Sequence, residues 1–415
     1  MTTDHDQPAG DRPLIILVSS GYHLWREYLL DQVARAARVW LFLAGEPTWE
    51  LRYVAGHTVV DTLDAAAMIA AARELAGREA VSGVLCWDEV RMVPASEVAR
   101  ALGLPGGETD AIGRCRDKHL TRVALDAAGV PQPRSVLAAS LEEARAAAGR
   151  IGYPVVLKPR ALGASFGVCG VESAAGLDAG YAEARGATED GVPYYEAGVL
   201  VEEYLSGEEI SVDSACVDGR LAPMFVARKL SGFPPYFEEV GHVVRADDPL
   251  LHDQGLLDLL QRAHQAVGFH TGITHTEVRL TADGPKIIEI NCRLGGDLIP
   301  YVASVASGID AGLIAVEVCC GRQATIARRR SRVASVNFCY PERDCTVEHI
   351  AVDEAALPES IDAVGVVARP GQQLLLPPAG HVTSRYAYVV AAGDSEQDCQ
   401  DAFQVAAKAI TLHTR

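Results

Sequence analysis

The sequence predicts an α/β protein that begins with a doubly wound parallel domain and continues into antiparallel sheets. In the first hundred residues, strand-like apolar runs at 14–19, 39–44 and 81–87 alternate with Ala-rich helical stretches, which is the pattern of a parallel sheet covered by helices. Later, the runs 273–281 and 285–291 flank an Ala-Asp-Gly sequence that favours a tight antiparallel turn. A chain of 415 residues is long enough for roughly two to four domains.

The other expected elements follow one another without an internal repeat. A helix is predicted over 25–37, and a second unit begins near Arg114 with a helix over 116–128 that ends at the Gly- and Pro-rich stretch 129–133. Further expected elements are a helix at 141–150, strands at 154–159, 199–204 and 210–217, a helix at 254–267, short strands from about 335, and a helix at 395–411. The expected parts are an N-terminal αβ domain at 1–113, a small subdomain at 114–205, a large subdomain at 206–335 and a C-terminal, sheet-containing subdomain at 336–415.

The composition is that of a globular protein. Hydrophobic residues make up 49% and charged residues 22% of the chain, and the net charge is −18. This acidic balance argues against nucleic-acid binding, which needs clustered Lys and Arg to neutralise phosphates. An acidic surface also repels a nucleotide, so each basic residue in a cleft is informative.

The sequence also predicts a cytoplasmic protein without a membrane anchor. Residues 1–12 are polar, and the first apolar run, 14–18, is shorter than the core of a signal peptide. No run approaches the roughly 20 apolar residues of a membrane-spanning helix. The 10 cysteines form no CxxC pair, and several lie in apolar runs, as buried thiols in a reducing compartment do. Cys319 and Cys320 are adjacent, and burial is favoured over reactivity for them as well.

Two loops after predicted parallel strands are candidate ligand sites. Residues 19–23 follow the first strand, and Asp88 and Glu89 follow the run at 81–87. Ligands of such sheets bind outside the carboxyl ends of the strands, although purely connective loops fit these sequences equally well.

The clearest chemical pattern lies on the predicted hairpin. Successive side chains of a strand alternate, so Glu289 and Asn291 share a face, as do His275, Glu277 and Arg279. If the two strands pair, two carboxylates and an amide converge, which suits Mg²⁺ together with substrate phosphates. An ordinary charged sheet face is the alternative, but Glu289 and Asn291 interrupt an otherwise apolar run.

Two segments upstream of the hairpin offer groups for a nucleotide. Lys158 ends an apolar strand, where a charge is costly without a partner, and the loop from Gly163 to Gly167 follows it. Glycines allow a phosphate to approach the backbone, although the loop is neither a P-loop nor a dinucleotide fingerprint and alone is better interpreted as a turn. The second segment, 199–209, joins a strand to a turn and carries carboxylates, so it can offer backbone groups to an adenine and a carboxylate to a ribose.

In this order and spacing, these segments resemble the ATP-grasp superfamily over about residues 114–300, and the preceding αβ unit fits its N-terminal domain. The resemblance implies ATP and Mg²⁺ or Mn²⁺ as cofactors. It implies nucleotide contacts from Lys118, Lys158, Gly163, Ser165, Phe166, Gly167, Glu202, Glu203, Leu205 and Glu209. In the same way, Glu202 is implied at the adenine, Glu209 at the ribose and Lys229 at the γ-phosphate. The implied metal ligands are Glu277, Glu289 and Asn291.

Two further segments resemble L-amino-acid ligases of the bacilysin-synthetase type. They are residues 235–242, Pro-Tyr-Phe-Glu-Glu-Val-Gly-His, and residues 291–300, Asn-Cys-Arg-Leu-Gly-Gly-Asp-Leu-Ile-Pro. This resemblance implies that Arg293 steadies the transferred phosphoryl group. It places the amino-acid site at Glu239, His242, His275, Gly295 and Gly296. A solvated loop is the alternative for Glu239 and His242, but function is enriched on loops.

The implied reaction joins a carboxylate to an amine. The carboxylate attacks the γ-phosphate of ATP to give an acylphosphate and ADP, and the amine then displaces phosphate. Amino acids are the implied substrates, and a homodimer is implied because family members are often dimers. The alternatives are an ATP-grasp carboxylase or purine-pathway-type enzyme, and a nucleotide-binding regulator without turnover. Glu239, His242 and Arg293 favour the ligase over the carboxylase, and the complete metal-ligand set argues against the regulator.

Overall fold

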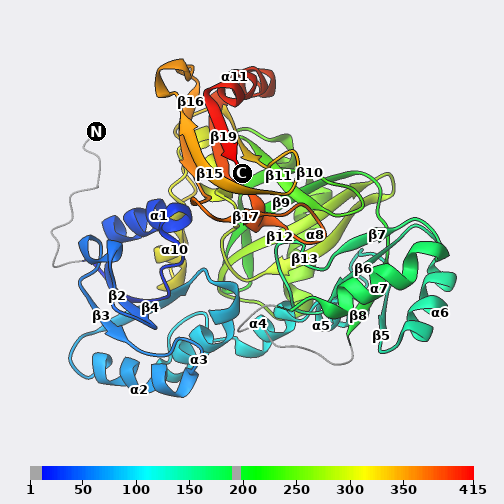
Figure 1. The fold of residues 1–415 in the computed structure, drawn as a ribbon. Coiled ribbons are helices and arrows are strands. Elements are labelled where there is room, and N and C mark those ends of the chain that lie inside the picture. The colour runs from blue at the N-terminus through cyan, green and yellow to red at the C-terminus, as the bar shows by residue number, and fades with distance from the viewer. Residues whose placement is uncertain (1–11, 189–197) are drawn as a thin grey trace.

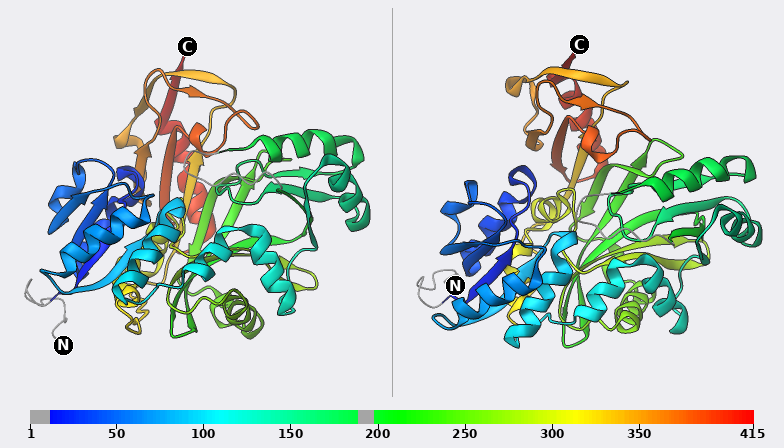
Figure 2. Two further views of the ribbon diagram at one scale, coloured as in Figure 1. Left: turned by 90° about the horizontal axis from the view of Figure 1, so that it is seen from below. Right: turned by 60° about the horizontal axis from the view of Figure 1, so that its bottom comes forward.

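The computed structural model describes residues 12–188 and 198–415, so the polar stretch 1–11 lies outside the described residues. The chain forms lobes around a central sheet (Figures 1 and 2). In Figure 1 the N-terminal lobe, in blue, and a smaller lobe, in cyan and green, lie on opposite sides of the molecule. The C-terminal strands and helix α11 (Glu396–Ala409) lie above the central sheet in the same view.

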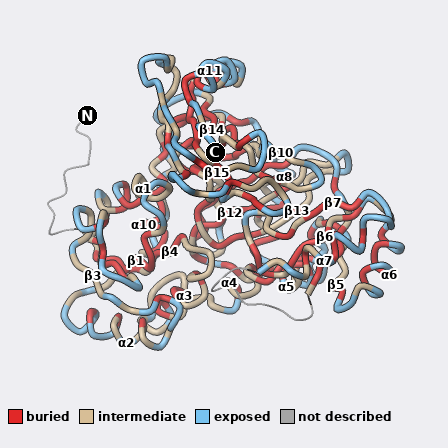
Figure 3. The backbone as a smooth tube through the Cα atoms, viewed as in Figure 1, coloured by how far each residue is buried: buried red, intermediate tan, exposed pale blue. Residues whose placement is uncertain are grey.

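The N-terminal lobe is a parallel sheet covered by helices on both faces. Its strands are β1 (Leu14–Val18), β2 (Arg38–Leu43), β3 (Gly56–Val59) and β4 (Val81–Cys86), in the order β3-β2-β1-β4. Ile15 and Leu17 pack against α1 (His23–Ala36) and α10 (Ala311–Cys319). Leu14, Ile16 and Val18 pack against α2 (Ala65–Ala76) and α3 (Met92–Leu102). All of β1 is therefore buried, as Figure 3 shows in red, and the predicted doubly wound fold is confirmed.

The small lobe begins with two helices where the sequence predicts one. Helix α4 (Thr109–Arg116) ends at Asp117, and α5 (Lys118–Ala127) begins after it. The break is stable because the Asp117 carboxylate accepts hydrogen bonds from the N–H groups of His119 and Leu120. This cap places Lys118 at the start of a new helix, where its side chain is buried.

An antiparallel sheet completes the small lobe. Its order is β5-β8-β6-β7, with strands β5 (Ser135–Ala138), β6 (Val155–Pro159), β7 (Cys169–Val171) and β8 (Val199–Glu203). Helices α6 (Leu141–Ile151) and α7 (Leu177–Gly186) pack on it through apolar side chains. The predicted strands at 154–159 and 199–204 are thus neighbours, which places Lys158 opposite Leu200.

The central sheet contains the predicted hairpin. Its order is β13-β12-β9-β10-β11-β14-β18-β16. The strands are β9 (Glu208–Val217), β10 (Arg220–Gly232), β11 (Glu238–Arg245), β12 (Gly272–Thr281), β13 (Gly284–Asn291), β14 (Val333–Cys339), β16 (Ile361–Val366) and β18 (Ala387–Gly393). Helix α8 (Gln254–Val267) packs against β10 and β13, and α9 (Ile299–Ser307) packs against β11 and β14.

The C-terminal part combines strands of the central sheet with a small sheet of its own. The small sheet has the order β17-β15-β19, with β15 (Cys345–Val352), β17 (Gln373–Leu374) and β19 (Ile410–Thr414). Because β14, β16 and β18 continue the central sheet, that sheet crosses the expected boundary at 335/336. The domain boundaries themselves stay predictions.

Two remaining observations concern the thiols and the apolar helices. All 10 cysteines are free, with Cys319 buried and Cys320 half-buried. Among the described helices, none is by itself long and apolar enough to cross a membrane. The apolar helices α9 and α10 form a pair that is bent by 112°, and most of their residues are buried in the core.

Candidate active site

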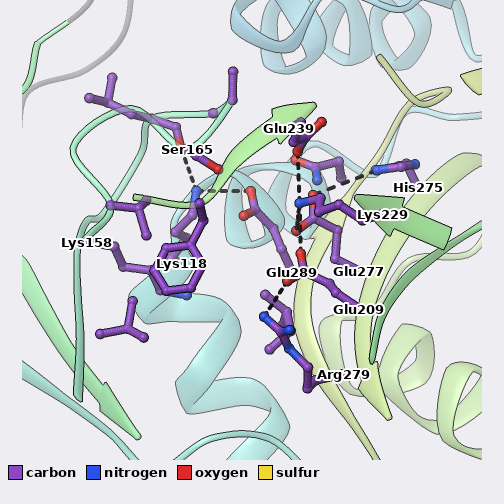
Figure 4. Close-up of a pocket in the computed structure, with 18 of the residues that line it drawn as sticks. Lys118, Lys158, Ser165, Glu209, Lys229, Glu239, His275, Glu277, Arg279 and Glu289 are labelled. Atoms are coloured by element: carbon purple, nitrogen blue, oxygen red, sulfur yellow. Dashed lines mark hydrogen bonds and ion pairs between the residues drawn. The ribbon is translucent and has the colours of Figure 1, made fainter. Parts of the chain in front are cut away.

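A cavity of about 170 Å³ collects most of the residues that the sequence singles out (Figure 4). Its wall comes from the small lobe, from the central sheet and from the segment that follows β13. The singled-out residues on this wall are Lys118, Lys158, Gly163, Ser165, Glu202, Glu203, Leu205, Glu209, Lys229, Glu239, His275, Glu277, Glu289, Asn291, Arg293 and Gly296. Phe166, Gly167, His242 and Gly295 lie beside the cavity rather than on its wall.

The hairpin brings the expected metal ligands together. Strands β12 and β13 pair so that Glu277 lies opposite Glu289 and His275 opposite Asn291. Burial raises the pKa of Glu277, and repulsion from the carboxylate of Glu289 raises it further, against the opposing effect of Lys229. Crowded carboxylates with an amide beside them form a donor set that suits a hard divalent cation.

Lysine ammonium groups lie against both of these carboxylates. The Nζ of Lys118 is 3.0 Å from Oε1 of Glu289 and donates a hydrogen bond of 2.6 Å to the carbonyl of Leu162. The Nζ of Lys229 is 3.4 Å from Oε2 of Glu277. Cations and carboxylates therefore alternate along the wall, an arrangement that can hold both phosphate oxygens and a metal ion.

The glycine loop follows β6 and is held in a tight, left-handed backbone. Ala164 (φ 51°), Ser165 (φ 58°) and Gly167 (φ 70°) all have positive φ. Hydrogen bonds from Phe166 N–H to the Gly163 carbonyl and from Val168 N–H to the Ser165 carbonyl close the turns. Non-glycine residues in this conformation are strained, and such strain persists mainly at ligand-binding loops.

The carboxylate of Glu202 is buried between two cations. It accepts hydrogen bonds from Arg122 at 2.7 and 3.2 Å, and Lys158 Nζ lies 2.6 Å away. Burial alone raises the pKa of this carboxyl group, but Arg122 and Lys158 overcome that effect and lower it to about 2. The sequence analysis does not single out Arg122. Helical periodicity does point to it, because it follows Lys118 by four residues and so lies on the same face of α5.

Lys229 links the segments expected at the ribose, the metal and the amino acid. Its Nζ lies 2.7 Å from Glu209 and 2.8 Å from Glu239, in addition to its contact with Glu277 (Figure 4). Burial lowers the pKa of this lysine, but the three carboxylates outweigh burial and raise the pKa well above its usual value. Glu209 is also paired with Arg279 at 2.5 Å.

His275 is oriented by an aspartate that the sequence analysis does not single out. Asp213 is fully buried on β9, opposite His275 of β12, and its Oδ1 lies 2.6 Å from Nδ1 of His275. The other oxygen of Asp213 accepts a hydrogen bond of 2.8 Å from Gly295 N–H. The second ring nitrogen of His275 then faces Glu277 at 3.8 Å. A carboxylate inside the apolar run 210–217 is the sequence signal for Asp213.

Arg293 meets the N-terminal lobe at one of the predicted ligand loops. Its Nε donates to the carboxylate of Glu89, which also accepts a hydrogen bond of 2.7 Å from Arg116. Burial opposes ionisation of Glu89, but the two arginines lower its pKa to about 2. The loop after β4 therefore reaches the cavity wall through Arg293.

The last group contains Glu239 and His242 of β11. The Nε2 of His242 lies 3.2 Å from Oε2 of Glu239 and 3.8 Å from Oδ2 of Asp297. Asp297 in turn accepts a hydrogen bond of 2.8 Å from Arg385, a residue of the C-terminal part that the sequence analysis does not single out. No local pattern marks Arg385, because its partners lie far away along the chain.

Comparisons with known proteins show which domain family and which folds the chain is similar to. Residues 151–301 match the ATP-grasp domain family. An uncharacterised protein of Sinorhizobium fredii is 29% identical over 96% of this chain and 82% of its own length. The alanine–anticapsin ligase of Bacillus subtilis is 27% identical over 61% of this chain, and the match spans 57% of that ligase. The crystal structure of the L-amino acid ligase from Bacillus licheniformis superposes with a TM-score of 0.81 at 20% identity, covering 97% of this chain and 99% of that chain.

The small lobe, the central sheet and the segment after β13 enclose one cavity whose wall carries both lysines and carboxylates. Residues 151–301 therefore form an ATP-grasp domain within this chain. The relatives that match this chain include alanine–anticapsin ligases and D-alanine–D-alanine ligases.

Proposed function

We propose that the protein is an ATP-dependent ligase that joins an amino-acid carboxylate to the amine of a second amino acid. The observation that carries the proposal is the presence, in one cavity, of two kinds of group. Lys118, Lys158, Glu277 and Glu289 form an alternating set of cations and carboxylates, and Glu239 lies beside them, joined to Glu277 through Lys229. The set of lysines and carboxylates suits a nucleotide with its metal ion, and Glu239 suits an amino acid.

The nucleotide is assigned to the small-lobe side of the cavity. Lys118 and Lys158 bind its phosphates under the glycine loop, Glu202 lies at the adenine, and Glu209 lies at the ribose. The named lysines supply the positive charge that an otherwise acidic protein needs at this place. ATP-grasp ligases use ATP with a divalent metal ion, and Glu277, Glu289 and Asn291 fit Mg²⁺ because all three offer oxygen atoms. A bound Mg²⁺ supplies charge neutralisation on the phosphates.

The proposed chemistry proceeds in two steps. An oxygen of the substrate carboxylate attacks the γ-phosphorus of ATP, the bond to the β-γ bridging oxygen breaks, and ADP leaves. The amine nitrogen then attacks the acyl carbon of the acylphosphate, phosphate leaves, and the amine loses one proton. Lys229 and Arg293 stabilise the transferred phosphoryl group, because fixed cations act most strongly in a site from which water is excluded.

A screen of amino-acid pairs tests this proposal. The purified protein is incubated with ATP, MgCl₂ and pairs of amino acids, and released ADP is measured beside mass spectrometry of the products. We expect ADP release that depends on particular pairs and equals the amount of dipeptide formed. ADP release that depends on bicarbonate would instead identify a carboxylase, and the absence of turnover with every pair would contradict the proposal.

A further inference from the structure

The carboxylate of Asp297 lies close to the carboxylate of Glu239 and the imidazole of His242. One ligand atom each from Glu239, His242 and Asp297 lies within 4.8 Å of the others. Glu239 and Asp297 also line the cavity, and the side chain of Asp297 is 24% exposed to it. The three groups therefore form a polar corner of the cavity wall.

Arg385 fixes the position of Asp297 from the C-terminal part of the chain. Its Nη2 donates hydrogen bonds of 2.8 Å both to Oδ2 of Asp297 and to the backbone carbonyl of Glu239. Its Nε donates a hydrogen bond of 3.0 Å to the hydroxyl of Tyr340, and its guanidinium lies 3.8 Å from the centre of the Phe338 ring. Arg385 is only 2% exposed, so this arrangement is rigid and shielded from water.

The imidazole in this corner has nitrogen atoms that lack a hydrogen-bond partner among the described residues. Among the described residues, no hydrogen bond is made by either ring nitrogen of His242, which is only 1% exposed, although Nε2 points between the two carboxylates. Oδ2 of Asp297 is held by Arg385 and lies 3.8 Å from Nε2 of His242. Buried polar groups are normally satisfied, so the ring nitrogens of His242 indicate that this corner accommodates a polar ligand.

We propose that Asp297 is a further substrate-binding residue, which shares one ammonium group of the amino-acid substrate with Glu239 and is positioned for this contact by Arg385. Two acceptors on one tetrahedral ammonium group, each about 2.8 Å from the nitrogen, lie about 4.6 Å apart. The ligand atoms of Glu239 and Asp297 lie within 4.8 Å of each other, so both carboxylates can reach one ammonium group. This inference rests on the proposed function and adds to it a residue that the resemblance does not supply.

An ammonium group fits this corner better than a second divalent cation does. Lys229 already lies 2.8 Å from Glu239, and Arg385 lies 2.8 Å from Asp297. A doubly charged ion would be repelled by both cations, whereas a singly charged ammonium ion is repelled less. Mg²⁺ also prefers a full set of oxygen ligands, and the imidazole of His242 does not supply one.

The test compares an amino acid with the analogue in which a hydroxyl replaces the ammonium group. The wild type and the variants Asp297→Asn, Arg385→Gln and Arg385→Lys are assayed for ADP release with each of the two compounds as carboxylate substrate. For Asp297→Asn we expect the preference for the amino acid over the hydroxy acid to fall about 10- to 100-fold, as for the loss of a hydrogen bond to a charged group. For Arg385→Gln we expect a higher KM for the amino acid with little change in kcat, and partial rescue in Arg385→Lys.

Controls separate this role from a structural one. The KM for ATP should stay within about twofold in all variants, and Arg245→Gln, which removes a half-exposed ion pair between β11 and α11, should behave as the wild type. An unchanged preference in Asp297→Asn would overturn the inference while leaving the proposed function intact. Asp297→Ser, which also removes the charged acceptor, carries the same test if Asp297→Asn does not fold. Binding of ZnCl₂ or MnCl₂ by the wild type that is lost in Asp297→Asn would also overturn it, in favour of a metal site. Turnover of no amino acid by the wild type would instead contradict the proposed function.

Discussion

Individual side chains in the cavity depend on each other through charge. Lys229 contacts Glu209, Glu239 and Glu277, so it neutralises carboxylates that are assigned to three different ligands. When one partner of a buried ion pair is removed, an uncompensated charge stays behind. The residues of this site are therefore best probed with isosteric substitutions that change charge and keep shape.

Glu289→Gln is the sharpest such substitution at the assigned metal site. The amide keeps the shape of the side chain but removes the charge that pairs with Lys118 and that the proposed metal ion would share. We expect amino-acid-dependent ADP release to fall at least about 100-fold while the thermal unfolding midpoint stays within a few degrees. Glu348→Gln, on an exposed position of β15, is the matched control. Activity of Glu289→Gln at the wild-type level would refute the metal assignment.

At the scale of elements, local sequence patterns predict the strands and helices around the site well. The hairpin β12–β13 is confirmed because both its alternation and its Asp-Gly turn are local signals. The predicted helix over 116–128 is found as α5, whereas α4 is not predicted. The separation of the two helices depends on the Asp117 cap and on the contact of Asp117 with Arg160. That contact spans 43 residues of sequence, beyond the reach of periodicity.

The backbone of the glycine loop leaves no room for a side chain at Gly167. A Cβ added to Gly167, at φ +70°, would lie 2.5 Å from the Cβ of Ala187, so the loop must shift to accept it. We expect Gly167→Ala to raise the KM for ATP about tenfold or more, and to destabilise the fold by about 1 kcal/mol. Gly149→Ala, in α6 with open space around the new methyl group, should keep the KM for ATP and stabilise the fold slightly. An unchanged KM for ATP in Gly167→Ala would show that the loop does not contact the nucleotide.

At the scale of the whole molecule, the site is assembled from parts that no local pattern connects. Asp213 orients His275 from a neighbouring strand, and Arg385 reaches Asp297 from 88 residues away along the chain. The sequence marks the groups with distinctive local patterns, such as Glu289 and Lys158, but not the residues that hold them. Those supporting residues are defined only by the order of the strands in the central sheet and by the packing of the C-terminal part against it.

We expect the free energy of unfolding of the whole molecule to depend on pH in acidic solution. Glu89 and Glu202 have pKa values of about 2 in the folded protein, against about 4.3 in an unfolded chain. Their contribution to stability is therefore present above about pH 4.3 and is lost as the pH falls toward 2. The raised pKa values of Glu108, Glu183 and Glu277 act in the opposite sense. They are outnumbered, because the pKa values of Glu209, Glu239, Glu289 and Asp297 are lowered as well. We expect the urea midpoint to fall between pH 5 and pH 3, and a midpoint that stays constant over this range would contradict the two buried ion-pair networks.

The central claim is that the enzyme activates a substrate carboxylate by phosphorylating it. The most direct measurement uses the amino acid that serves as carboxylate donor, labelled with ¹⁸O in its carboxylate, together with unlabelled ATP and water. If an acylphosphate forms and the amine displaces phosphate, one ¹⁸O atom passes from the carboxylate to each phosphate released, which mass spectrometry detects. Ligation that releases only unlabelled phosphate would contradict the account.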